Sequence, residues 1–298
     1  MKRLFIFAGV LASIGLLLGF FGLILLDFDF TKLDRMDYEA RVYEITEDFS
    51  EIHMDLDTAD VRFVLAEDGV CRVECMEAEK LAYTVEVKEG SLNIVTKDSR
   101  KWYDYIGVFN SSHPMTVYLP KAQYDHLSID VSTGDVQIPD GFTFGKLTLE
   151  GSTGDVSFGR VSVNSMDIRV STGDIELTGV RATNMTLKVS TGEISLSDVR
   201  TEESLSVETS TGDVTLSHVI SYGMTVECTT GDVSLTDCNA FSIKITTTTG
   251  DIEGTLLQEK WFVTETTTGS VNVPASQGMQ GGYCYLTTTT GDIDIRLS

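Results

Sequence analysis

The sequence has few of the residues from which reactive or metal-binding sites are built. Its 298 residues include five cysteines, with no C-x-x-C pair, and four histidines. The histidines are far apart, at His53, His113, His126 and His218. This spacing fits neither a zinc site nor a redox motif. We therefore expect no metal, no cofactor and no catalytic residue, and we interpret Asp125 beside His126 as a coincidence of sequence.

Basic residues are also scarce. Lysine and arginine number 22 against 45 aspartates and glutamates, which gives a formal net charge of −23. Nucleic acids and anionic lipid headgroups bind to basic patches. The composition therefore argues against both as partners and favours a solvated acidic surface that repels other anions.

The cysteines are too few, and odd in number, for a disulfide framework. Cys71 and Cys75 lie four residues apart on one expected strand, about 13 Å, which is too far for a bond. Cys228, Cys238 and Cys284 occupy inward positions that other repeats fill with Val, Leu or Met. We interpret these three as small buried core residues.

Charge is absent from residues 4–26. A helix of that length spans the roughly 30 Å core of a bilayer. Basic residues precede the run and acidic residues follow it, so the N-terminus is expected in the cytoplasm and the rest outside. A cleaved secretory signal is the alternative, but its apolar region is usually only about 7–15 residues and ends in small residues. We therefore expect residues 1–26 to be an uncleaved, single-pass anchor in the cell membrane.

One corner motif dominates the second half of the chain. Thr-Gly, followed in most copies by Asp, occurs nine times within residues 127–298, at intervals of 20, 19, 19, 20, 19, 19, 19 and 22 residues. The glycines are Gly134, Gly154, Gly173, Gly192, Gly212, Gly231, Gly250, Gly269 and Gly291. A fixed period of about 20 residues indicates a solenoid in which each repeat is one coil.

Apolar and polar residues alternate on both sides of each corner. The positions seven, five and three before the glycine are mostly apolar, as in Met185, Leu187 and Val189. The positions two and four after it are apolar again, as in Val136 and Ile138. Period-two alternation predicts half-buried strands, and about 19 residues leave no room for a crossover helix. We therefore predict an all-β, right-handed parallel β-solenoid, preceded by one N-terminal transmembrane helix.

The residues of the corner suit a tight bend. Glycine supplies a positive φ, the following aspartate can accept hydrogen bonds from free backbone N–H groups, and stacked threonine hydroxyls can bond from coil to coil. We therefore assign the nine glycines a structural role rather than a ligand-binding one.

The chain divides into four expected segments: the anchor (1–26), a charged stalk (27–45), an N-terminal β cap with irregular coils (46–126) and the regular solenoid (127–298). Ala59 stands where later corners have glycine, so the first coil is expected there and residues 66–113 interrupt it. Within the interruption, residues 82–87 and 91–96 are expected to form a hairpin.

Two features concern the ends of the solenoid. An aromatic segment contains Trp102, Tyr103, Tyr105 and Phe109, which we interpret as a lid over the core, with partner or glycan binding as the alternative. At the other end, residues 292–297 are expected to be the outermost strand, and the Gly-rich stretch 277–282 is expected to fold across it as a partial cap. The alternative is that this edge stays open and pairs end to end with a second molecule.

The repeated Ser/Thr-Thr-Gly-Asp-Val/Ile corners behind an N-terminal anchor resemble the bacterial putative-adhesin family, a family of domains of unknown function. The resemblance covers residues 50–298. It implies an extracytoplasmic β-solenoid in the cell envelope, with links to envelope stress, and it supplies no catalytic residues.

These observations favour a non-enzymatic, membrane-anchored, adhesin-like binding or scaffold protein. Its expected partners are envelope proteins or cell-wall glycan. One alternative is a sensor that passes an outside signal to other membrane proteins. A polysaccharide-acting enzyme is disfavoured, because such β-helix enzymes need long loops and converging carboxylates.

Overall fold

The computed structural model describes residues 13, 15, 21, 38–99, 114–276 and 281–298. Within them, no helix has the length and apolar character that crossing a membrane requires. The expected anchor falls outside the described residues apart from three positions, and Trp102, Tyr103, Tyr105 and Phe109 lie outside them as well.

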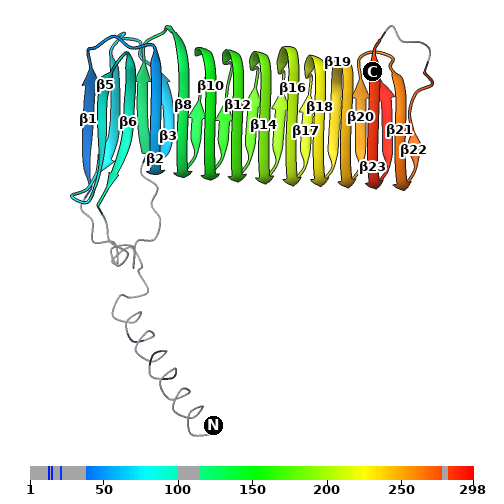
Figure 1. Ribbon diagram of the computed structural model, residues 1–298, viewed down its shortest axis with the longest axis horizontal. Coiled ribbons are helices and arrows are strands. Elements are labelled where there is room, and N and C mark those ends of the chain that lie inside the picture. Colours follow the sequence, from blue (N-terminus) through cyan, green and yellow to red (C-terminus); the bar gives the residue numbers. More distant parts are fainter. Residues whose placement is uncertain (1–12, 14, 16–20, 22–37, 100–113, 277–280) are drawn as a thin grey trace.

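As predicted, the chain winds into a parallel β-solenoid, and the strands of its coils form two facing sheets (Figure 1). In spatial order, sheet A contains β1 (Glu39–Ile45), β4 (Cys71–Glu77), β7 (Pro114–Leu119), β3 (Asp60–Leu65), β9 (Val136–Ile138), β11 (Val156–Phe158), β13 (Ile175–Thr178), β15 (Ile194–Ser197), β17 (Val214–Ser217), the start of β19 (Val233–Thr249), β20 (Ile252–Leu256), β24 (Ile293–Leu297) and β22 (Val271–Asn272).

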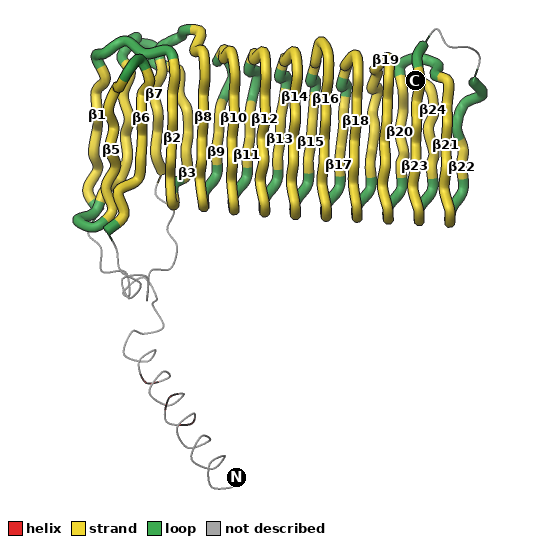
Figure 2. The backbone as a smooth tube through the Cα atoms, in the orientation of Figure 1, coloured by secondary structure: helices red, strands yellow, loops and turns green. Residues whose placement is uncertain are grey.

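Sheet B carries the longer strand of each coil (Figure 2). In spatial order it contains β5 (Leu81–Lys88), β6 (Ser91–Asp98), β2 (Glu51–Thr58), β8 (Gln123–Thr133), β10 (Thr143–Thr153), β12 (Ser162–Thr172), β14 (Arg181–Thr191), β16 (Arg200–Thr211), β18 (Ile220–Thr230), the end of β19, β23 (Tyr283–Thr290) and β21 (Trp261–Thr268).

The core lies between the sheets and is built from columns of equivalent residues. The column two positions after the corner glycine includes Val136, Ile175 and Val233, each no more than 1% exposed. The valines expected as a third apolar contact are also buried, as at Val180 and Val219. Full burial of such a side chain stabilises by about 1.5–3 kcal/mol, so a repeated column of them holds each coil against the next.

The corner glycines are packed backbone against backbone. Their φ angles lie between 136° and 150°. A β-carbon on any of them would lie 2.0–2.2 Å from the carbonyl oxygen of the corner residue in the adjacent coil. At the beginning of the array that adjacent residue is Ala59, whose carbonyl faces Gly134.

The corner aspartates form a ladder along the solenoid. Each carboxylate accepts a hydrogen bond from the backbone N–H of the equivalent residue in the next coil, as from Asp155 to Asp135 and from Asp174 to Asp155, both 2.9 Å. Within the described residues, Glu193 is the interruption, because Asp213 donates no such bond to its longer side chain. The ladder gives a physical reason for aspartate beside each glycine.

The threonine hydroxyls depart from the expected pattern. The threonines that stand directly before the corner glycines are mostly exposed. In the described structure their hydroxyls make no hydrogen bond from coil to coil. Threonine hydroxyls three residues before the glycine do bond to the corner carbonyl of an adjacent coil. Thr247 and Thr288, for example, donate to the carbonyls of Gly231 and Gly250.

At the N-terminal end, the expected interruption is a folded cap. The predicted hairpin is confirmed as β5 and β6, which pair antiparallel through a turn with positive φ at Glu89 and Gly90. β1 pairs antiparallel with β4. The last seven residues of the expected stalk, Glu39–Ile45, therefore belong to the cap.

At the C-terminal end, the expectation that the final strand is outermost was wrong, and the expected cap, residues 277–282, lies outside the described residues except for Gly281 and Gly282. β24 lies between β20 and β22, and β23 lies between β19 and β21. The last coil of the chain, β23 and β24, thus lies between the coil of β19 and β20 and the coil of β21 and β22. In Figure 1 its red strands lie inside the orange strands of β21 and β22. The outermost strands at this end are β21 and β22.

Candidate functional site

A stripe of aromatic side chains crosses the outer face of sheet B near its C-terminal end. We call these residues the aromatic stripe: Tyr222 on β18, Phe241 on β19, Tyr283 and Tyr285 on β23, and Trp261 on β21. Four of them are strongly exposed, from 62% for Tyr222 to 40% for Trp261. Because buried residues alternate with them along each strand, their side chains point away from the core.

Four of the rings contact one another, across neighbouring strands and along β23. Tyr222 and Phe241 stack with centroids 5.4 Å apart and ring planes within 9°. Phe241 meets Tyr283 edge-on at 6.3 Å, and Tyr283 stacks on Tyr285 at 6.2 Å. Trp261 is the register partner of Tyr283. Large exposed apolar patches of this kind mark binding surfaces on soluble folds.

The charges beside the stripe are already paired. Lys244, three residues after Phe241 on β19, places its ammonium 3.2 Å from the Glu227 carboxylate. Lys260, next to Trp261, is only 1% exposed. Its Nζ donates to Asn239 Oδ1 at 2.7 Å and to the carbonyls of Ala240 and Gly281 at 2.6 and 2.5 Å.

Burial lowers the pKa of Lys260. All three of its donors are used inside the protein. Lys260 therefore holds neighbouring coils together and leaves no cation on the stripe for an anionic ligand.

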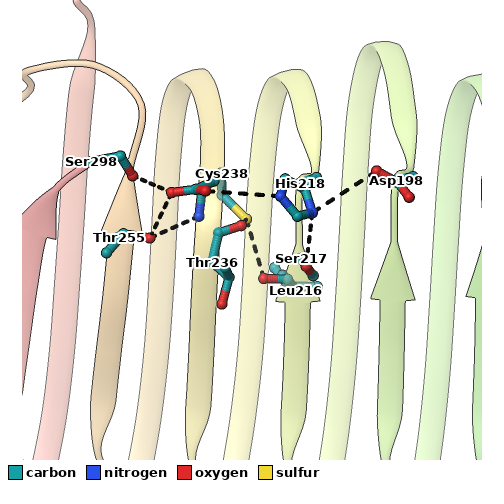
Figure 3. Close-up of polar contacts among 9 residues, drawn as sticks. Asp198, Leu216, Ser217, His218, Thr236, Cys238, Thr255 and Ser298 are labelled. Atoms are coloured by element: carbon teal, nitrogen blue, oxygen red, sulfur yellow. Dashed lines mark hydrogen bonds and ion pairs between the residues drawn. The ribbon is translucent and has the colours of Figure 1, made fainter.

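A second cluster, shown in Figure 3, combines residue types used in nucleophilic catalysis. His218 Nδ1 lies 3.0 Å from Ser217 Oγ and 3.9 Å from Asp198, and its Nε2 lies 3.8 Å from Asp237. The hydroxyls of Ser298 and Thr255 donate to Asp237 and lower its pKa, with Ser298 having the larger effect.

The geometry of this cluster does not suit catalysis. Both carboxylates are beyond hydrogen-bond distance of the imidazole, and the His218 side chain is 56% exposed. A serine nucleophile requires a base oriented by a hydrogen-bonded acid. These residues instead occupy equivalent positions in the bend that follows the sheet A strand of each coil: Asp198, His218 and Asp237. Their φ angles lie between 51° and 55°, a conformation that Asp and His tolerate better than most residues do.

A shallow trough of about 430 Å³ lies farther along the solenoid, over Gly151 and a row of serines. Most of its charged side chains pair with their neighbours. Arg169 lies 2.7 Å from Asp167 and 3.8 Å from Glu150, and Lys188 pairs with Glu208. These ion pairs are a ladder of surface charges rather than a focused site.

The thiols are inert in this fold. All five cysteines are free and buried. Burial raises the pKa of Cys71, Cys75 and Cys284 to about 12, so these thiols stay protonated at neutral pH. The interpretation of Cys228, Cys238 and Cys284 as core residues is confirmed. Among the described residues, no three His, Cys, Asp or Glu side chains are placed to hold a metal ion.

Sequence reasoning missed the aromatic stripe, although a signal was present. Tyr222 and Phe241 each stand nine residues before a corner glycine, where five earlier repeats have Asp125, Gly145, Asn164, Thr183 and Glu203. A search for aromatic residues at positions that other repeats fill with polar or small residues would have found the first two rings. The others join them only through the order of the coils.

The fold and these surfaces define a parallel β-solenoid repeat protein. Within that class, the chain belongs to the Toastrack DUF4097 family, whose sequence profile matches residues 49–204 and 185–298. No curated protein matches the chain.

Solved structures share the fold at low identity. A structure named a putative adhesin from Parabacteroides distasonis ATCC 8503 is 13% identical with a TM-score of 0.54, covering 88% of this chain and 98% of its own. One named a putative lipid binding protein from the same organism is 16% identical with a TM-score of 0.52, covering 87% and 97%. A putative adhesin from Parabacteroides merdae ATCC 43184 is 13% identical with a TM-score of 0.52, covering 87% and 96%. At these identities the likeness concerns the fold alone.

Proposed function

We propose that the protein is a non-enzymatic binding module of the cell envelope, tethered by residues 1–26, which uses the aromatic stripe to hold an uncharged glycan chain. The observation that carries the proposal is the row of mutually contacting, exposed rings on a rigid sheet. Solved structures with this fold, which are named putative adhesins and a putative lipid binding protein, support a binding role.

An extended glycan suits the shape of the stripe. Neighbouring strands lie about 4.8 Å apart, so a polymer lying across β18, β19, β23 and β21 would meet a ring on each strand. The C–H faces of pyranose rings are apolar, and aromatic side chains offer large contact areas at low cost in conformational entropy. Tyrosines in such a row also carry hydroxyls that can exchange hydrogen bonds with sugar hydroxyls.

The charges favour an uncharged glycan. The chain carries a net charge of −23, and Lys244 and Lys260 beside the stripe are both engaged. An anionic polymer would therefore meet repulsion without a compensating cation.

A lipid is a poorer ligand for this structure. An acyl chain needs an enclosed apolar pocket. The space between the sheets is filled by buried side chains, and the hollows on the described surface, such as the trough, are shallow and open.

The test compares how well two resins retain the full-length chain in mild detergent. The first is insoluble chitin, an uncharged glycan, and the second is an anionic polyuronate resin. We expect retention on chitin, and a loss of at least tenfold, about 1.4 kcal/mol, when Tyr222 and Phe241 are both changed to Ala. Lys188→Ala, in the trough, is the matched control and should bind as the parent does.

Three outcomes would reject the proposal. They are absence of retention on chitin, equal losses in the stripe and trough variants, and stripe-dependent binding to phosphatidylcholine vesicles in place of glycan.

A further inference from the structure

The two ends of the solenoid are closed differently. At the N-terminal end, β1, β4 and β5 add antiparallel strands, and Tyr43, Val85 and Val87 pack against the core. At the C-terminal end, β21 and β22 are the last strands. Among the described residues, no further strand pairs with either of them.

Inward-facing residues are uncovered at this second end. Val271 occupies the same column as Ile293 and Ile252, which are 1% and 0% exposed, yet Val271 is 43% exposed. Phe262 is likewise only half-buried, whereas its register partner Cys284 is fully buried. Val273, just after β22, packs against the core and covers part of this end, while Val271 stays uncovered.

The edge has little protection against pairing. Natural edge strands are usually blunted by proline, lysine, a bulge or short length. β21 is eight residues long, has no proline, and carries one charge, Glu265. The backbone N–H of Phe262 is taken by the Ser276 hydroxyl at 3.0 Å, which covers one position of the strand rather than its length.

This end is locally neutral in a strongly acidic chain. Residues 260–276 contain one lysine and one glutamate, so their formal charges cancel, whereas the whole chain carries −23. Self-association at this face therefore meets less charge repulsion than it would elsewhere.

We propose that a second copy of this chain docks here, end to end, with β21 and β22 each pairing antiparallel with their own copy. A twofold axis perpendicular to both sheets achieves the two pairings at once, and such isologous contacts are self-complementary. In this pairing Thr264 lies opposite Thr264 of the second copy. Glu265 then lies opposite Val263 of the second copy rather than opposite another carboxylate. The same axis leaves both aromatic stripes on one face, so that a polymer can engage two of them.

The interface is small, and the association is accordingly weak. Eight residues span about 27 Å and facing sheets lie about 10 Å apart, giving an end face on the order of 300 Å² against the roughly 800 Å² per partner of stable complexes. We expect a dissociation constant of about 10–100 μM, in the range of transient contacts.

The experiment is sedimentation velocity of the full-length chain in detergent micelles from about 1 to 200 μM, across the expected dissociation constant. The parent should shift from monomer to dimer. Val271→Lys should stay monomeric, since each copy would then bring a positive charge into the apolar contact between the two ends. Val42→Lys is the matched control on β1 at the opposite end, where Val42 is 57% exposed, and it should dimerise as the parent does.

Disulfide trapping provides a second measurement that does not depend on the stability of Val271→Lys. Thr264→Cys should give a covalent dimer on mild oxidation, and Thr264→Ser should not. A parent that stays monomeric at the highest concentration, equal effects of the two lysine variants, or no trapped dimer would overturn the proposal. Chitin retention at 1 μM tests the stripe separately, because the chain is then monomeric.

Discussion

At the scale of single residues, the solenoid depends on positions where a side chain is not tolerated. Each corner glycine brings its Cα so close to the adjacent coil that a β-carbon would overlap a backbone oxygen. The requirement is thus steric as well as conformational. Both the positive φ and the close approach exclude other residues, which explains why the glycine recurs in all nine corners.

Gly192→Ala should therefore be strongly destabilising. Its β-carbon would lie 2.0 Å from the Gly173 carbonyl oxygen, which belongs to backbone and cannot rotate away. Strain and displacement together should cost about 3 kcal/mol or more. Urea denaturation provides the measurement. Gly223→Ala is the control, because its β-carbon would make an ordinary 3.5 Å contact with Glu203, and a similar loss in both variants would contradict the steric account.

His126 should make the fold sensitive to mild acid. Burial lowers its pKa, Lys146 and His53 lower it further, and Glu51 opposes them. Just below pH 6.5, His126 therefore stays neutral in the folded state. In the unfolded chain its pKa is near 6.5, so it takes up a proton in the same pH range. The stabilising contribution is present above about pH 6.5 and is lost as the pH falls through the folded pKa.

His126→Gln should flatten this dependence, with the amide retaining a hydrogen bond to Thr148, which now lies 3.0 Å from His126 Nε2. Unfolding free energies measured from pH 7.5 to 5 would test it. An unchanged slope in the variant would show that another group is responsible.

At the scale of the elements, both ends exchange the order of two coils. At the N-terminal end, β6 and β7 lie outside β2 and β3, although they follow them in the chain. At the C-terminal end, β23 and β24 lie inside β21 and β22. The corner interval there is 22 residues rather than 19, and the three extra residues lengthen the connection that must return past a coil.

Deleting residues 293–298 tests this order of the strands. It removes the strand between β20 and β22, including the buried Ile293 and Ile295, each contributing about 1.5–3 kcal/mol. Hydrogen exchange should accelerate across residues 261–273 and remain slow across residues 127–219. If β24 were outermost instead, β21 and β22 would keep their protection.

Deletion of residues 296–298 alone provides the control. It retains Ile293 and Ile295, so exchange in residues 261–273 should stay close to that of the parent. Fast exchange in both deletants would indicate general fraying rather than loss of a central strand.

At the scale of the whole molecule, the solenoid is a rod with two unlike ends and one decorated face. The antiparallel cap closes the end nearer the N-terminus, and the uncovered core lies at the other. The aromatic stripe occupies the open half of sheet B, while the ion-paired trough lies over its middle coils. Binding and self-association are thereby assigned to neighbouring surfaces that share Trp261 on β21, and substitutions at Tyr222 and Phe241 or at Val271 test them independently.

Much of this architecture was predictable from the sequence, because its determinants are local. The period of the Thr-Gly corners sets the coil length, and period-two alternation identifies the buried columns and hence the two facing sheets. The hairpin of β5 and β6 follows from Glu89 and Gly90 between two alternating runs. Nothing beyond one repeat and its neighbour is needed for these inferences.

The order of the coils was decided only in the tertiary structure. Because every corner has nearly the same chemistry, one coil fits against another in the same register whichever comes next in the chain. The sequence alone therefore placed β21 beside β19 and left residues 292–297 as the edge. Insertion of β23 instead sets Tyr283 against Phe241 and moves Trp261 to the rim, and it leaves Val271 rather than Ile293 uncovered. The complete aromatic stripe and the open end both follow from this order of the coils, which depends on contacts between coils and not on chain order.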